Sequence, residues 1–168
     1  NALTITPVGQ WGANIVNAFD TEWQALNGQI VNSLAFPADK GLKDEISILL
    51  NINQSNWRKI KLQKLLGQNL GFSARRRKDF DMIFLNALPT HAREIVPLLR
   101  FYYAGSVPIY ATSQVYIGLP DARRDKDRNG VQFTVMPWAL NPTAQAQQLR
   151  QQFKHYWPTS FNQFSLLY

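Results

Sequence analysis

Cysteine is absent from the 168-residue sequence, which excludes disulfide bonds, thiolate metal sites and a cysteine nucleophile. Histidine occurs only at His91 and His155. Neither belongs to a recognisable set of catalytic groups, so we assign no catalytic residue. No apolar run approaches the ~20 residues that a membrane-spanning helix needs. The length allows one domain with one sizeable core.

Motifs for nucleotides and for hydrolysis are missing as well. No GxGxxG follows a predicted strand, and neither GxxxxGK[ST] nor GxSxG occurs. Asp125, Asp127 and Asn129 alternate before Gly130 as in the first half of a calcium loop, but the twelfth position holds Met136 instead of a bidentate glutamate. A turn before a strand explains this pattern better. The sequence therefore indicates no cofactor and no metal, and it favours a hydrolase or transferase least.

Acidic residues are lacking from one stretch, residues 57–78, which contains eight lysines and arginines. The rest of the chain carries ten basic and eleven acidic residues, so the net charge of +7 belongs to this stretch. Such a local concentration of positive charge suits an acidic partner, an anionic polymer or simply solvent.

Hydrophobic periodicity predicts strands that alternate with helices. The predicted strands cover residues 3–7, 29–36, 80–85, 107–113 and 131–136. The third is a nearly continuous apolar run, so it is expected to be buried on both faces. The predicted helices cover residues 11–26, 42–50, 55–66, 90–104 and 143–157. Leu26 of the first helix and Leu149 of the last are among the residues expected to face inward. This alternation favours an α/β fold, a three-layer sandwich with a mostly parallel sheet of about five strands. We expect residues 1–168 to form a single unit, with Asn1 and Ala2 left over from cloning and outside the fold.

Helix ends are predicted from capping residues. We expect Asp39 to cap the second helix, Thr90 the fourth and Thr143 the last, and glycines at Gly28 and Gly105 to end helices. Pro97 falls inside the fourth helix, where it removes a hydrogen bond. A kink at Pro97, or a later start of that helix, is therefore expected.

Polar and aromatic side chains follow the predicted strands where ligands bind in parallel sheets, at the carboxyl edge. The candidate cleft residues are Trp11, Asn86, Thr90, Thr112, Ser113 and Trp138. They would allow the chain to grip a small solute.

The basic stretch belongs to a helical connection, residues 51–78, that leads directly into the third strand. Its last four residues, Arg75, Arg76, Arg77 and Lys78, are a candidate contact surface for an acidic protein patch or an envelope polymer. Alternatively, the arginines pair with Asp79, Asp81 and aspartates of residues 121–127. Binding of nucleic acid is a minor alternative, because no aromatic residue lies among the four cations.

Several stretches together resemble the LppC/LpoA family of outer-membrane lipoproteins. The resemblance follows the order of the family and is carried by residues 11–12, 18–19, 22–23, 75–85, 92–104, 108–113, 129–133 and 136–138.

The resemblance implies one lobe of a region similar to type I periplasmic binding proteins, whose two lobes close like a flytrap. The apolar tail, residues 159–168, would then return to the missing lobe. It further implies a non-catalytic regulator that binds and activates a class A penicillin-binding protein, with peptidoglycan as a further contact and no nucleic acid. Such a protein would lie on the periplasmic side of the outer membrane, held by a lipid anchor outside these residues.

Overall fold

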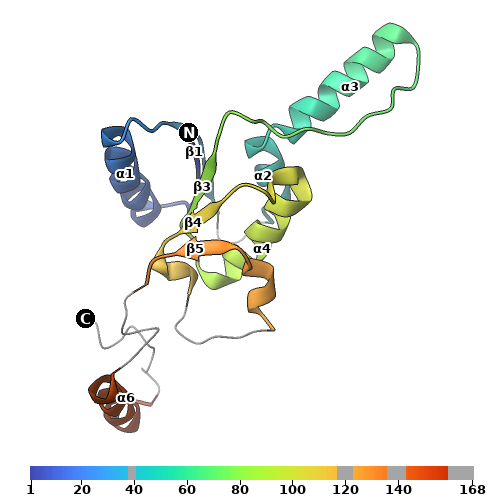
Figure 1. Cartoon of the computed structure of the whole chain (residues 1–168). Helices are drawn as coiled ribbons and strands as arrows, with labels where there is room; N and C mark the ends of the chain where they lie inside the picture. Colours follow the sequence, from blue (N-terminus) through green and yellow to red (C-terminus); the bar gives the residue numbers. More distant parts are fainter. Residues whose placement is uncertain (38–40, 117–122, 136–142, 159–168) are drawn as a thin grey trace.

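A five-stranded parallel sheet organises the computed structural model, which describes residues 1–37, 41–116, 123–135 and 143–158. Within these residues the strands lie in the order β2-β1-β3-β4-β5 (Figure 1). Their bounds are β1 Ala2–Pro7, β2 Ile30–Phe36, β3 Met82–Leu85, β4 Ile109–Ala111 and β5 Val131–Phe133. All four neighbouring pairs are parallel, which confirms the predicted α/β class.

Strand β1 lies between β2 and β3 and is buried from Ala2 to Thr6. Ala2 pairs with Ile30 on one side and with Met82 on the other. The Ala2 backbone N–H donates to the Gln29 carbonyl oxygen at 2.8 Å, and the Asn1 carbonyl oxygen accepts from the Asp81 backbone N–H at 2.9 Å. Both residues that we expected to lie outside the fold therefore take part in it, because β1 lies between two strands that bond its backbone groups.

Helices cover the two faces of the sheet, as the three-layer prediction requires. Helix α1 (Gln10–Ala25) lies on one face, and α2 (Lys43–Leu49) and α4 (Pro89–Leu99) lie on the other (Figure 1). The face under α2 and α4 is well buried. The residues of these two helices that enter the core are Ile46, Leu49, Ala92, Ile95, Val96 and Leu99.

The face under α1 is covered less completely. Phe19 of α1 stacks on Phe84 of β3 with ring centroids 4.1 Å apart, yet Phe84 stays half-buried. Leu26, predicted to face inward, is exposed because α1 ends at Ala25. Strand β3 was expected to be buried on both faces, but only Ile83 and Leu85 are, on the side away from Phe84.

A residue with left-handed backbone conformation follows α1, and another lies in the turn that continues α4, but neither is the predicted glycine. Asn27 (φ 61°) and Tyr103 (φ 66°) adopt this conformation, whereas Gly28 and Gly105 do not. Asparagine tolerates it well because its short polar side chain bonds locally. Tyr103 belongs to a π-helical turn, Arg100–Ala104, that continues α4.

Helix α4 begins at Pro89, about two turns before Pro97, and not at a later residue. Leu88 precedes the helix and Pro89 occupies its first turn, so the predicted cap at Thr90 is wrong. Proline suits that position, because the first backbone N–H groups of a helix have no partner within it. Pro97 lies inside the helix, and the irregular geometry comes after it, in the π-helical turn.

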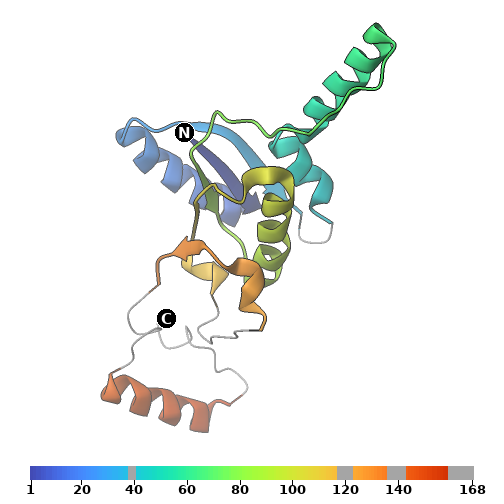
Figure 2. The same ribbon diagram turned by 45° about the vertical axis from the view of Figure 1, so that its right-hand side comes forward.

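A long projection connects α2 to β3. Helix α3 (Ile52–Leu66) points away from the sheet, turns at Gly67 (φ 62°), and residues 68–78 run back beside it (Figures 1 and 2). We call residues 52–78 the basic arm. The predicted start at Ser55 is three residues late, since Asn51 (φ 59°) precedes the helix and Ser55 is buried within it.

Two short turns and a helix complete the described chain. Ser113–Val115 and Asp125–Arg128 form 3-10 turns between β4 and β5, and α6 covers Ala144–Tyr156. Thr143 caps α6 as predicted, since its hydroxyl oxygen accepts the Ala146 N–H at 3.2 Å. Leu149, predicted to face inward, is exposed. The apolar tail 159–168 and the predicted cap Asp39 lie outside the described residues.

Candidate functional site

Asn86 and Thr112 meet at the carboxyl edge of the sheet. Each directly follows a strand, β3 or β4, and the Thr112 hydroxyl donates to the Asn86 amide oxygen at 2.9 Å. The Asn86 backbone N–H donates to Ile5, which ties β3 to β1 at this point. Asn86 is fully buried, and its amide nitrogen has no partner among the described groups. The topology thus brings two of the predicted cleft residues into direct contact.

Three other cleft candidates, Trp11, Thr90 and Ser113, lie at the same edge of the sheet. Trp11 and Thr90 lie in the first turns of α1 and α4 and are exposed. Ser113 begins the 3-10 turn after β4 and is half-buried. Trp138 lies outside the described residues. The described part of this edge is therefore a polar rim that could contact a ligand or a second lobe.

Helix α1 approaches the same edge very closely at Gly12. A Cβ atom there would lie 2.0 Å from the Pro7 carbonyl oxygen and 2.5 Å from the Thr6 hydroxyl. Neither backbone nor buried Thr6 has room to yield. Glycine is therefore required for α1 to begin against the end of β1, which places Trp11 on the rim.

The basic cluster at residues 75–78 divides into two kinds of side chain. Arg76 donates from Nε to the Tyr103 carbonyl oxygen at 2.9 Å, and its guanidinium lies 5.0 Å from the centroid of the Phe80 ring. Arg77 bonds Asp79. Arg75 and Lys78 are exposed. Two cations therefore hold the base of the basic arm, and two face solvent.

The Arg77–Asp79 pair is bidentate. Nε and Nη2 of Arg77 donate to the two carboxylate oxygens of Asp79 at 2.7 and 2.6 Å. The hydrogen bond from Arg77 lowers the pKa of Asp79, and the same bond raises the pKa of Arg77. The alternative in which these arginines pair with neighbouring aspartates thus holds for Arg77. Asp81 instead bonds the terminal amine of Asn1.

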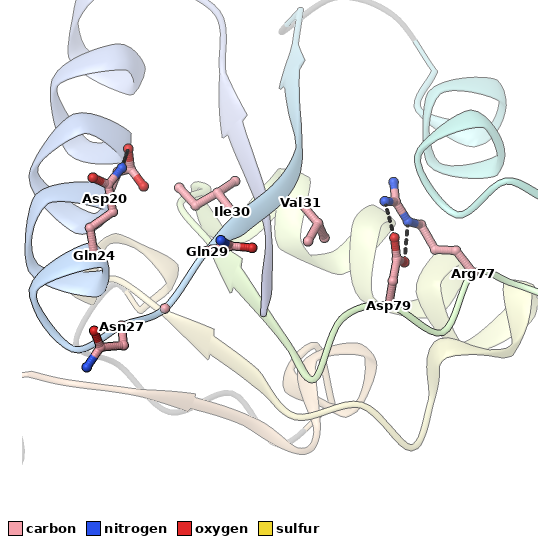
Figure 3. A pocket seen from close by; sticks show the side chains of 9 residues that line it. Asp20, Gln24, Asn27, Gln29, Ile30, Val31, Arg77 and Asp79 are labelled. Carbon is pink, nitrogen blue, oxygen red and sulfur yellow. Dashed lines mark hydrogen bonds and ion pairs between the residues drawn. The ribbon is translucent and has the colours of Figure 1, made fainter.

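An open hollow of about 780 Å³ lies beside this pair. Figure 3 shows the side chains that line it. Asp20 and Gln24 of α1 line it on one side, together with Asn27 just after that helix. Arg77 and Asp79 bond each other on the far side. It lies at the amino ends of β2 and β3. Parallel sheets bind ligands at the opposite edge, and the guanidinium here is already paired, so this hollow is a poor candidate for a site.

The aspartate-rich turn before β5 is held by an ion pair. Arg128 bonds Asp125 and the carbonyl oxygen of Val115, which fixes the turn against the end of β4. Within the described residues, no group of three histidines, aspartates or glutamates could hold a metal ion. In the same part of the chain, no helix is long and apolar enough to span a bilayer.

Sequence reasoning missed a set of apolar side chains on α3. Exposed residues of this kind occur along its length: Trp57, Ile60, Leu62, Leu65 and Leu66. The available signal was the mixed pattern of residues 55–66, in which lysines and leucines do not segregate to separate faces. Such a pattern predicts poor packing against a core.

The family model described as LppC putative lipoprotein matches residues 1–168. The chain belongs to the LppC family. A curated relative from Photobacterium profundum, named penicillin-binding protein activator LpoA, is 26% identical over 164 residues, which are 95% of this chain and 26% of the relative. The chain therefore spans about a quarter of that relative's length. The family indicates a cell-envelope lipoprotein, and the relative is named as an activator and not as an enzyme.

Solved structures show the same fold. Full-length LpoA from Haemophilus influenzae matches with a TM-score of 0.58 at 20% identity, covering 90% of this chain and 23% of that one. A substrate-binding protein of an ABC transporter from Sphaerobacter thermophilus matches with a TM-score of 0.58 at 13% identity, covering 92% of this chain and 36% of that one. The expected fold of a periplasmic-binding-protein lobe is thereby confirmed for this LppC chain.

Proposed function

We propose that this chain is one lobe of a non-catalytic regulator that binds and activates a class A penicillin-binding protein during peptidoglycan synthesis. One observation carries the proposal: a relative that aligns with 95% of the chain is named a penicillin-binding protein activator. The Asn86–Thr112 pair at the carboxyl edge joins an amide to a hydroxyl, two groups that suit contact with a partner or a ligand.

The proposal of a single lobe is supported by the uncovered side of the sheet. Parallel strands are normally covered on both faces. On the α1 side, an apolar hollow of about 630 Å³ lies between Phe19, Phe84 and Tyr110, and Tyr110 and Phe133 are exposed there. Further chain that packs on this face would complete the layer. The chain also matches only 36% of the length of the substrate-binding protein, which agrees with this interpretation.

In this proposal, a lipid anchor outside residues 1–168 holds the protein on the periplasmic side of the outer membrane. Arg75 and Lys78 remain candidate contacts to peptidoglycan or to an acidic protein surface, because both are exposed. Arg76 and Arg77 contribute less to such a contact, since they are engaged within the chain.

A pull-down with purified proteins tests the proposed function. The full-length lipoprotein that contains this lobe is immobilised and offered the cognate class A enzyme, with a monofunctional penicillin-binding protein as the control. Retention of the class A enzyme alone is the expected result. Equal retention of both enzymes, or of neither, would show that the chain serves another role.

A second candidate function is the binding of a small solute, which the buried Asn86 amide nitrogen favours because it lacks a partner among the described groups. Solutes would bind between two lobes, so the test is a thermal-shift screen of amino acids, sugars and peptidoglycan fragments on the full-length protein. Saturable stabilisation that is lost in Thr112→Val would favour this function. No stabilisation by any compound would leave the regulator as the better account.

A further inference from the structure

The basic arm carries more exposed apolar surface than its own folding requires. Trp57 is 66% exposed and Leu65 is 72% exposed, and Ile60 and Leu66 are exposed as well. Single exposed apolar residues are common on protein surfaces, but a group of them on one projecting element marks an interaction site. Only Ile52 and Ser55 of α3 are buried, both in its first turn.

The base of the arm is fixed to the body by specific bonds. The backbone N–H of Arg77 donates to the Leu50 carbonyl oxygen at 2.9 Å. The backbone N–H of Arg75 donates to the hydroxyl of buried Ser55 at 3.1 Å. Arg76 adds its contacts to Tyr103 and Phe80. These bonds close the arm into a loop with a fixed root, so its outer part is presented away from the sheet (Figures 1 and 2).

The outer part of the arm is held together by cation–aromatic contacts. The Lys59 ammonium lies 5.3 Å from the Phe72 ring centroid and joins α3 to the returning segment. The Lys61 ammonium lies 5.8 Å from the Trp57 ring centroid within α3. The arm therefore presents aromatic and aliphatic groups together with positive charge, and none of its residues is acidic.

The arrangement of these groups around α3 discriminates among possible partners. Residues four apart share one line along a helix, and two adjacent lines of α3 mix both kinds. Trp57, Lys61 and Leu65 lie on one, and Arg58, Leu62 and Leu66 lie on the next. A helix that lies on a lipid surface separates its apolar and basic faces. The mixed lines of α3 therefore disfavour a membrane as its partner.

A second copy of the chain is disfavoured by charge. Two arms would repel each other, and the remaining residues carry ten basic and eleven acidic groups, too nearly balanced to attract a strongly basic element. An acidic protein surface with apolar pockets between its carboxylates complements both properties of the arm. Aromatic anchors and flanking charges are the usual components of such an interface.

We propose that the basic arm is a docking element for an acidic, partly apolar protein surface, with Trp57 and Leu65 as anchors and Arg58, Lys61 and Lys64 as the charges that complement it. The inference rests on the proposed function in one respect: it places that surface on the penicillin-binding protein. The arm then supplies part of the contact through which the lobe engages its partner.

The test compares variants of the full-length lipoprotein by biolayer interferometry against the immobilised class A enzyme. Trp57→Ala/Leu65→Ala removes the anchors, and Arg58→Gln/Lys61→Gln/Lys64→Gln removes the charge. Leu26→Ala on the residue after α1 and Lys43→Gln on α2 are matched controls, since both residues are exposed and lie outside the arm. Thermal unfolding verifies that every variant folds, and the Trp57 and Leu65 changes can be measured singly if the pair does not.

We expect each arm variant to weaken binding at least about tenfold, as loss of an interface anchor does, with the controls unchanged. Raising the salt concentration should weaken the wild type and the anchor variant, and the charge variant much less. Unchanged binding by folded arm variants, while the wild type binds, overturns the docking element and leaves the proposed function intact. Absence of wild-type binding overturns both. Arm-dependent binding to peptidoglycan sacculi or to heparin, but not to the enzyme, would assign the arm to a polyanion and overturn the inference.

Discussion

Arg77 donates two parallel hydrogen bonds to Asp79, two residues later in the chain, with nitrogen–oxygen distances of 2.7 and 2.6 Å. The pair lies where the basic arm returns to the sheet and just before β3 begins. It therefore fixes the direction in which the chain enters the sheet. Arg77 is 13% exposed at its side chain and Asp79 is 53% exposed, so solvent screens the pair from one side.

The pair predicts a modest dependence of stability on pH. Arg77 lowers the pKa of Asp79, so the ionised carboxylate stabilises the folded state at pH values above the ordinary carboxyl pKa. This contribution should be lost as the pH falls from about 4 through the lowered pKa. Because Asp79 is largely exposed, we expect only about 0.2–1 kcal/mol. Thermal unfolding of the wild type and Asp79→Asn should differ at neutral pH and converge in acid; a difference that persists in acid would contradict this origin.

The three arginines at residues 75–77 should respond differently to replacement. Arg77→Ser removes the bidentate pair, and Arg76→Ser removes the bond to Tyr103, so both should increase hydrogen exchange in residues 75–82. Arg75→Ser should leave exchange unchanged, because the bond that Arg75 makes to Ser55 comes from its backbone. Equal loss of protection in all three variants would show that Arg75 also holds the arm.

Thr112→Val should destabilise the carboxyl edge of the sheet. The change preserves shape but leaves the buried Asn86 amide oxygen without the hydroxyl donor, which costs about 1–3 kcal/mol. Thr90→Val is the matched control, because Thr90 is exposed and should change stability by no more than about 0.5 kcal/mol. Hydrogen exchange of the β3 and β4 backbone amides measures the loss of stability in each variant. Similar protection in both variants would mean that Asn86 finds another donor.

Gly12→Ala should be among the most damaging single substitutions. The added Cβ would collide with the Pro7 carbonyl oxygen at 2.0 Å, so α1 or β1 must move, at a cost of about 1–3 kcal/mol or more. Gly41→Ala is its control, because a Cβ built there meets no described atom within 4 Å. Hydrogen exchange of the α1 and β1 backbone amides at increasing urea concentrations measures the stability of the two variants. A tolerated Gly12→Ala would show that α1 approaches β1 less closely.

Much of this fold could be predicted because its elements follow hydrophobic periodicity. Residues such as Ile46, Ile95 and Leu99 recur at helical spacing and are buried on α2 and α4. The residues that follow parallel strands lie at one edge of the sheet, so the sequence predicts that Asn86 and Thr112 share that edge. The structure adds the hydrogen bond between them.

The basic arm could not be predicted in the same way. Its apolar residues do not gather on one helix face. Its position depends on hydrogen bonds between residues far apart in the sequence, such as those from Arg75 to Ser55 and from Arg76 to Tyr103. The helix ends were missed for a related reason. Asn27 and Tyr103 adopt left-handed conformations that favour glycine, and the sequence offers a glycine one or two residues later in each case.

The most direct test of the proposed function is the fraction of cross-linked peptides that the cognate class A penicillin-binding protein makes from lipid-linked precursor. It is measured with and without the full-length LppC-family protein, and with that protein alone. The account predicts that the cross-linked fraction rises when both proteins are present and that the lipoprotein alone forms no cross-links. An unchanged fraction with correctly folded protein, or cross-links formed by the lipoprotein alone, would contradict it.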